Sequence, residues 1–290
     1  MDSRLAFKDF TERLKLLIQK RPDLITITLS NIFTMRLIGN KTHGDLAEIG
    51  IAEFINQYMY DFNSIHVGKD LYRAKSQEED ITITNDLTKV TFPVSLKAYG
   101  VGPLQLSTDK HSLMFSRLEK ERKKRIEGNT INSIINDPGF APLYQTNVLP
   151  LIYDEKKKKC NIMVFDSIQA VKSISSIVLE DGTHANTKGK GRKYPVYRFY
   201  DKSNRYICEV RYGGASANAL QRGLWTHSKN GVDFFDSISN GWIDYSHNRV
   251  LVKLFSHALI SDVSSHEKSL KILTESIELL KHAKSRGGKQ

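Results

Sequence analysis

Residues 79–100 read EDITITNDLTKVTFPVSLKAYG, and this stretch predicts a β-hairpin. Isoleucine and threonine alternate over residues 81–84, which is the pattern of a strand with one buried face. Asn85-Asp86 is a typical turn pair. Apolar residues then recur at every second position from Val90 to Leu96 and indicate a second strand.

Polar residues gather at the open end of this predicted hairpin. Ser95 and Lys97 fall on the face of the second strand opposite to the apolar one. Asp80 stands just before the first strand, so pairing of the two strands brings it beside Ser95 and Lys97. The hairpin therefore predicts an acid and a lysine in one small site.

A predicted helix at residues 45–60, DLAEIGIAEFINQYMY, adds a second acid. At about 100° per residue, Glu48 falls within an apolar stripe, whereas Glu53 points toward amides. A carboxylate in an apolar stripe is costly to bury unless a partner compensates it. Glu48 is therefore the preferred candidate, with Glu53 as the alternative, and a buried arginine or a backbone donor would be an ordinary partner for it.

Phosphodiester hydrolysis is a reaction that these residue types support. A metal ion held near the phosphate polarises it and activates a water molecule, and Mg²⁺ prefers oxygen ligands. Asp80, Glu48 and the backbone carbonyl of Leu96 supply such oxygens. Lys97 can hold the attacking water or a phosphate oxygen.

The constellation of Asp80, Ser95-Leu96-Lys97 and the helical Glu48 resembles the PD-(D/E)XK nucleases, in particular type II restriction endonucleases. The resemblance covers residues 40–100. It implies an α/β fold with a restriction-endonuclease-like central mixed β-sheet flanked by helices, and an additional β-rich part that recognises DNA. It also implies Mg²⁺ as cofactor, a homodimer on a palindromic site, and a cognate DNA methyltransferase.

Two departures from the family pattern concern the same site. Glu79 precedes Asp80 where the family has proline, and Ser95 replaces the usual second acidic residue. The number of metal ions therefore stays open, as does the role of Ser95. Whether Glu48 substitutes for the missing carboxylate also stays open.

The charge of the whole chain favours a polyanionic partner. Lys and Arg number 43 against 32 Asp and Glu, which gives a net charge of +11. Basic side chains that neutralise phosphates release condensed counterions and so bind nucleic acid. Residues 115–127, FSRLEKERKKRIE, predict a charged helix that is either solvated or follows phosphates.

Residues 210–227, VRYGGASANALQRGLWTH, also look like segments of bacterial restriction enzymes. Residues 215–225 predict a helix, with its polar side turned either to DNA or to solvent. Amides pair with adenine and arginine with guanine in the major groove. The candidates for contact with double-stranded DNA, including a basic segment before this one, are Lys190, Arg192, Lys193, Asn218, Gln221, Arg222, Thr226 and His227.

The remaining sequence predicts two parts. Residues 3–20 predict an amphipathic helix, and the chain becomes β-rich after Tyr144. We expect a catalytic α/β core at 1–140 and a β-rich DNA-recognition portion with a C-terminal helix at 141–290, although the two parts can share one core. Two cysteines make no disulfide framework, and no signal peptide or membrane span is evident, so we expect a cytoplasmic protein.

These observations favour a type II restriction endonuclease that hydrolyses phosphodiester bonds in duplex DNA. Two alternatives come from other classes. One is a non-catalytic, sequence-specific DNA-binding protein, and the other is a basic structural protein that binds no nucleic acid. Metal-dependent cleavage separates the first reading from both alternatives.

Overall fold

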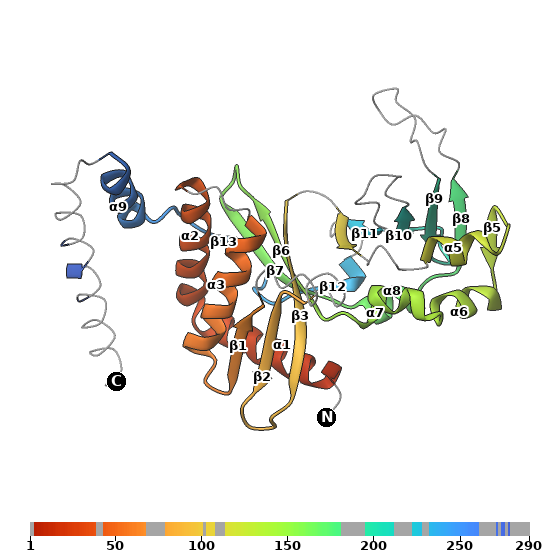
Figure 1. Cartoon of the computed structure of the whole chain (residues 1–290), viewed down its shortest axis with the longest axis horizontal. Coiled ribbons are helices and arrows are strands. Elements are labelled where there is room, and N and C mark those ends of the chain that lie inside the picture. Colours follow the sequence, from red (N-terminus) through yellow and green to blue (C-terminus); the bar gives the residue numbers. More distant parts are fainter. Residues whose placement is uncertain are drawn as a thin grey trace.

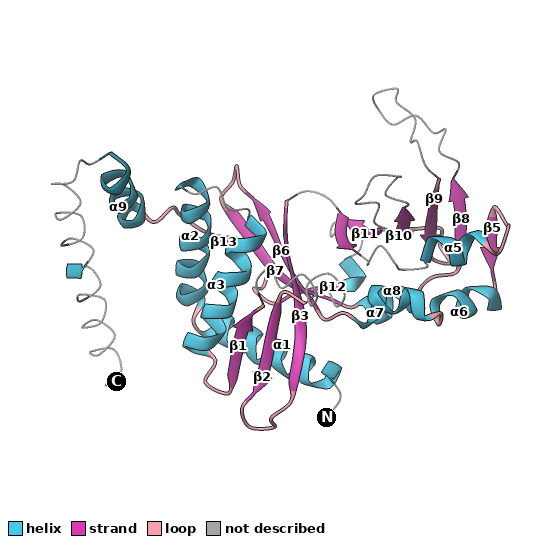
Figure 2. Cartoon of the chain, viewed as in Figure 1, coloured by secondary structure: helices cyan, strands magenta, loops and turns pink. Residues whose placement is uncertain are grey.

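The computed structural model describes most of the chain. The described residues are 3–38, 43–67, 79–100, 103–107, 114–180, 195–211, 222–227, 232–260, 271, 274, 275 and 278. Within them the protein is a mixed α/β protein with two β-sheets (Figures 1 and 2). No helix of these residues combines the length and the apolar character that crossing a membrane requires.

The first sheet has seven strands among the described residues, in the order β1-β2-β3-β6-β7-β12, with β13 also paired to β7. Its strands are β1 (Phe62–His66), β2 (Ile81–Asn85), β3 (Thr91–Tyr99), β6 (Val148–Asp154), β7 (Lys159–Phe165), β12 (Phe235–Ser237) and β13 (Ile243–Asp244). β3 and β6 run parallel, whereas the other neighbours are antiparallel, so the sheet is mixed as the sequence predicts. Strands from both sides of residue 140 build it.

Three N-terminal helices pack against this sheet: α1 (Ser3–Lys20), α2 (Pro22–Ile38) and α3 (His43–Tyr58). The helix predicted at residues 3–20 is confirmed. Pro22 follows the end of α1 and is the first residue of α2. Proline is tolerated at this position because its missing N–H is one that the first turn of a helix leaves without a partner within the helix. The helices form one apolar core with the hairpin face that carries Phe92, Val94 and Leu96.

The second sheet is antiparallel and has six strands among the described residues, in the order β4-β11-β10-β9-β8-β5. Its strands are β4 (Pro103–Ser107), β5 (Arg125–Glu127), β8 (Ser176–Glu180), β9 (Val196–Tyr200), β10 (Tyr206–Arg211) and β11 (Arg222–His227). Its apolar face packs into a second core, to which Ile177, Phe199 and Val210 belong. The two sheets lie in different parts of the molecule, joined by the chain from β3 to β4 and by the helices between β5 and β8 (Figure 1).

Short helices and α9 complete the described fold. They are α5 (Met114–Glu119), α6 (Asn129–Ile135), η1 (Pro138–Phe140), α7 (Ala141–Gln145), α8 (Ser167–Lys172), η2 (Val232–Phe234) and α9 (Arg249–Ile260). Asn248 ties α9 to the first core, because its backbone N–H donates to Thr34 Oγ1 (2.6 Å) and its side chain accepts from the N–H of Val250 (3.0 Å).

Two predicted helices differ from the structure. The charged helix ends at Glu119, Arg122 has a positive φ of 49°, and Arg125–Glu127 forms strand β5. Ile126 is buried in the second core, and pairing with β8 outweighs the helix propensity of the lysines and arginines around it. Residues 222–225 of the second predicted helix belong to strand β11, paired on both sides, and residues 215–221 lie outside the described part.

Candidate functional site

Asp80 is the residue on which the hairpin's polar groups converge. Its Oδ2 accepts hydrogen bonds from Ser95 Oγ (3.0 Å) and from the backbone N–H of Leu96 (2.7 Å). Lys97 Nζ lies 3.4 Å from the same oxygen. The backbone N–H of Asp80 donates to Val94 O (3.2 Å), so the antiparallel ladder of the hairpin continues to Asp80 and sets its position. The structure therefore places Asp80, Ser95, Leu96 and Lys97 together.

The backbone of Leu96 faces Asp80 for a topological reason. The N–H of Ser95 donates to Asn147 O (2.8 Å), on the side where β6 runs parallel to β3. Successive residues of a strand present their backbone groups to opposite edges. The N–H and C=O of Leu96 therefore face the other edge, where β2 has just begun and where the N–H meets the Asp80 carboxylate. The carbonyl oxygen of Leu96 is thus presented on the side of the candidate site.

Glu48 reaches the same region from α3. It lies on the helix stripe of Ile51, Ala52 and Ile55, which are all buried, while its own side chain keeps 20% exposure. Burial raises the pKa of Glu48, and the negative charge of Asp80 raises it further. Glu53 is exposed on another side of the helix. Of the two glutamates considered from the sequence, Glu48 is the one that interacts with Asp80.

The partner of Glu48 is His66, a residue that the sequence analysis missed. His66 Nε2 lies 3.1 Å from Glu48 Oε2, and this bond partly opposes the rise of the Glu48 pKa. His66 is the last residue of β1, on the face that also carries Phe62 and Ser64. The alternation in FNSIH was therefore an available signal, because it places the histidine on the inward face of an edge strand.

Glu79 is not equivalent to Asp80, although the two acids are adjacent. Its side chain is buried, and its carboxylate accepts a hydrogen bond from Thr82 Oγ1. Asp80, in contrast, contacts Ser95, Leu96 and Lys97. This distinction identifies Asp80 as the acid of the site.

The donor set fits Mg²⁺ bound through few protein ligands. Within the described ranges no group of three or more His, Cys, Asp or Glu residues could hold a metal ion. Burial is the main cause of the raised Glu48 pKa, and the charge of Asp80 adds to it, so a cation between the two carboxylates would relieve their repulsion. Mg²⁺ in proteins commonly binds one or two carboxylates and takes its other ligands from water and substrate phosphates. Asp80, Glu48 and the Leu96 carbonyl match that pattern.

The predicted DNA-contacting residues fall into two groups. Lys190, Arg192, Lys193, Asn218 and Gln221 lie outside the described residues. Three others belong to β11 of the second sheet, where the backbone pairs Arg222 with Arg211 and His227 with Pro103, and where Thr226 precedes His227. The second sheet, not the hairpin of the candidate site, carries these three.

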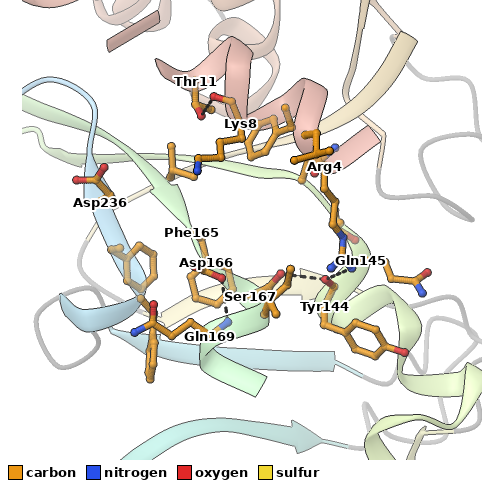
Figure 3. A pocket seen from close by; sticks show the side chains of 18 of the residues that line it. Arg4, Lys8, Thr11, Tyr144, Gln145, Phe165, Asp166, Ser167, Gln169 and Asp236 are labelled. Atoms are coloured by element: carbon orange, nitrogen blue, oxygen red, sulfur yellow. Dashed lines mark hydrogen bonds between the residues drawn. The ribbon is translucent and has the colours of Figure 1, made fainter. Parts of the chain in front are cut away.

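A cavity of about 490 Å³ lies between the N-terminal half of α1 and the segments around α7, α8 and β12 (Figure 3). Arg4 Nη2 donates to Tyr144 O (3.0 Å) across it, and Phe165 and Phe235 give it an apolar wall. Neither Asp80 nor Lys97 nor Glu48 lines this cavity. It is therefore distinct from the candidate site on the hairpin.

Comparison with protein families, with curated proteins and with solved structures found no match for this chain.

Proposed function

We propose that this protein is a type II restriction endonuclease, which hydrolyses phosphodiester bonds of duplex DNA at a specific sequence with Mg²⁺ as cofactor. The observation that carries the proposal is the convergence of Ser95, Leu96 and Lys97 on one carboxylate oxygen of Asp80, with Glu48 nearby. The three contacts lie within one hairpin, and the charge of Asp80 also acts on Glu48, a helix residue 32 positions upstream.

Each residue has a distinct task in the proposed site. Asp80 and Glu48, with the Leu96 carbonyl, would hold Mg²⁺, which supplies Lewis acidity at the scissile phosphate. Ser95 and the Leu96 N–H fix the Asp80 carboxylate in one orientation. Lys97 presents its ammonium group to a phosphate oxygen or to the attacking water and stabilises the negative charge that develops there.

The second sheet and the net charge support DNA as the substrate. The chain carries +11, and electrostatic attraction to phosphates brings a basic protein onto DNA without sequence preference. Sequence preference then needs side chains that reach base edges. An antiparallel sheet attached directly after the catalytic strand supplies a surface for such side chains.

The proposal includes the partners that the family resemblance implies. A homodimer would cut both strands of a palindromic site, because two-fold protein symmetry matches two-fold sequence symmetry. A cognate methyltransferase would protect the host DNA, and the enzyme would act in the cytoplasm.

Substitutions in the hairpin test the site assignment. We expect Asp80→Ala and Lys97→Ala each to lower the cleavage rate by roughly 10²–10³-fold or more, the loss typical for removal of a charge-stabilising group. DNA binding in EDTA should persist in the Lys97→Ala protein. Asp86→Asn, an exposed acid at the turn end of the same hairpin, and Lys20→Ala, an exposed lysine at the end of α1, are matched controls that should cut at the normal rate.

The outcomes separate the candidate functions. If Asp80→Ala and Lys97→Ala cut as fast as the wild type, the site assignment is wrong even for a nuclease. If the wild-type protein binds one DNA sequence but never cuts it with any divalent metal, the non-catalytic DNA-binding function replaces the proposal. Salt-insensitive, weak DNA affinity would instead favour the structural basic protein.

A further inference from the structure

The second sheet buries a charged residue on the face that turns away from its core. Glu209 of β10 retains only 4% side-chain exposure, and its neighbours Cys208 and Val210 point into the second core. A buried carboxylate is costly unless charged donors compensate it. Two arginines do so: Arg198 Nε donates to Oε2 (3.2 Å), and Arg211 Nε donates to Oε1. Glu209 therefore holds one guanidinium on each of its oxygens.

The two arginines are bound differently. Arg198 is held at a second point, because its Nη1 donates to Glu180 Oε1 (2.7 Å). Burial disfavours the charge of Arg198, but Glu180 and Glu209 outweigh that effect and raise its pKa. Arg198 thus serves mainly to neutralise the two glutamates.

Arg211 is held by Glu209 through Nε alone among the residues that the structure describes. Its Nη1 and Nη2 groups have no partner within that part of the chain, and its side chain is 38% exposed. A guanidinium fixed at Nε presents the Nη1–Nη2 edge outward with a defined direction. That edge carries two parallel N–H donors, the geometry that pairs with O6 and N7 of guanine.

The register and the connection to β3 put this arginine within reach of the same DNA as the candidate site. Arg222, a predicted DNA-contacting residue, is the cross-strand partner of Arg211. β11 pairs in turn with β4, where Arg222 lies opposite Ser107, ten residues after Lys97. Ten residues span at most roughly 35 Å. The β4 residue beside Arg222 therefore lies within about one turn of a DNA helix of Lys97, since one turn is roughly 34–36 Å long.

We propose that Arg211 is a sequence-reading residue that contacts a guanine in the major groove, and that Glu209 is the positioning residue that directs it there. The inference rests on the proposed function and extends it, because it names the base and the residue that recognises it. In an ordinary ion-pair network, all donors of the arginine would be bound by neighbouring residues. Nη1 and Nη2 of Arg211, in contrast, have no partner among the described residues, and the side chain is partly exposed.

Another arginine of the same part provides a matched control. Arg205 is also held by a largely buried acid, Asp201, with Nε donating to Oδ2 (2.7 Å). Its Nη1 is bound by Asp233 (3.1 Å), and it lies at the turn between β9 and β10, outside the strands. It resembles Arg211 in its anchoring but not in having a two-donor edge without a partner.

The test measures binding in EDTA, so that it does not depend on cleavage. The wild-type protein first selects its preferred duplex from a random-sequence library. Affinities are then measured for that duplex and for copies in which each guanine in turn is replaced by 7-deazaguanine, which lacks N7. We expect one guanine position at which the wild type loses affinity by roughly 10–100-fold, the range of one bidentate contact.

The variants assign that position to a residue. Arg211→Ala should bind the selected duplex about as weakly as the wild type binds its deaza copy, and should show no further loss with that copy. Glu209→Gln should shift in the same direction while melting as one folded protein, and Arg205→Ala should behave as the wild type.

Two results overturn the inference and are distinguishable. If Arg211→Ala keeps the wild-type affinity and the full sensitivity to 7-deazaguanine at every position, Arg211 reads no guanine, and the proposed nuclease function is untouched. If the wild type selects no sequence at all from the library, both this inference and the proposed sequence specificity fail.

Discussion

At the residue scale, the candidate site depends on the orientation of the Asp80 carboxylate. Asp80 receives three donors from consecutive residues of one strand, so its side chain has little freedom left. Ser95 contributes a hydrogen bond but no charge to this arrangement. The structure thus gives Ser95 a positioning contact, and the second carboxylate is that of Glu48, whose pKa the charge of Asp80 raises.

The raised pKa of Glu48 predicts a conflict between stability and function. Its pKa in the folded protein lies above the ordinary value of 4.5 because of burial and the charge of Asp80. Folding is therefore penalised once Glu48 ionises: the penalty is absent below the unfolded-state pKa and grows as the pH rises through the folded-state pKa. We expect Glu48→Gln to raise the melting temperature at pH 7 in EDTA, to lose that advantage near pH 4, and to abolish cleavage.

Thermal melting from pH 4 to pH 7 checks this prediction. Glu53→Gln is the matched control, because it removes an exposed glutamate from the same helix and should leave the melting temperature unchanged. A lower melting temperature of Glu48→Gln at pH 7 would mean that the bond to His66 outweighs burial and repulsion, and would contradict the account.

Some residues of the candidate site could be predicted from the sequence, and others could not. Strand alternation places Asp80 beside Lys97, and helix periodicity singles out Glu48, because both patterns are local. The pairing of Glu48 with His66 depends on how α3 crosses β1, and the burial of Glu209 depends on which face of the second sheet is covered. Neither property is encoded in a short window of sequence.

At the element scale, α1 organises the first core through aromatic packing. Phe10 is fully buried, and the centroid of its ring lies 5.4 Å from the ring centroid of Phe62 and 6.0 Å from that of Phe92. One side chain of the first helix thus contacts both β1 and β3, the strand that carries Lys97. The position of the candidate site depends on this contact.

Truncation of Phe10 should therefore be among the most destabilising single changes in the first core. We expect Phe10→Ala to lower the free energy of unfolding by about 3–5 kcal/mol, the usual cost of emptying a buried phenylalanine site. Leu5→Ala, on the exposed face of the same helix, should change it by less than about 0.5 kcal/mol. Urea denaturation measures both, and a cost below about 1 kcal/mol for Phe10→Ala would show that α1 does not anchor the sheet.

Elements with strong local periodicity were predictable, and those that rely on distant pairing were not. The helix at 3–20 and the hairpin around residue 85 are confirmed, since their patterns repeat within a few residues. The prediction of one helix over residues 115–127 was wrong, because Ile126 pairs with Ile177, 51 residues later in the chain. Sequence order alone does not reveal that pairing.

At the scale of the whole molecule, β6 connects the two cores. Val148 belongs to the second core and Leu149, the next residue, to the first. The strand also pairs with β3 in parallel, beside the candidate site. We therefore expect the two cores to open together rather than independently.

The two cysteines provide a probe for each core. Cys160 is buried in the first core, where burial raises its thiol pKa to about 12, and Cys208 is buried in the second core with a raised pKa. Because the thiolate is the reactive form, neither should react with a thiol reagent in the folded protein. In Cys208→Ala and Cys160→Ala proteins, the remaining thiol should become reactive at the same denaturant concentration. Reaction of one thiol at a concentration that leaves the other protected would show that the cores open separately.

The predicted mixed sheet with flanking helices agrees with the structure, and the boundary near residue 140 stays a prediction. Strands β6, β7, β12 and β13 come from beyond that residue and complete the first sheet. Composition changes along the chain, but the parallel pairing of β3 with β6 joins distant segments. Long-range pairing of this kind decides which strands share a sheet.

The central claim is that Asp80, Glu48 and Lys97 form a Mg²⁺-dependent site that cuts duplex DNA at one sequence. Its most direct test is incubation of the wild-type protein with unmethylated plasmid and phage DNA, in Mg²⁺ and in EDTA, followed by sequencing of the fragment ends. The account predicts discrete fragments in Mg²⁺ alone, with ends that share one short palindromic sequence. Intact DNA in Mg²⁺ and Mn²⁺ across a set of unmethylated genomes, from protein that is folded, would contradict it.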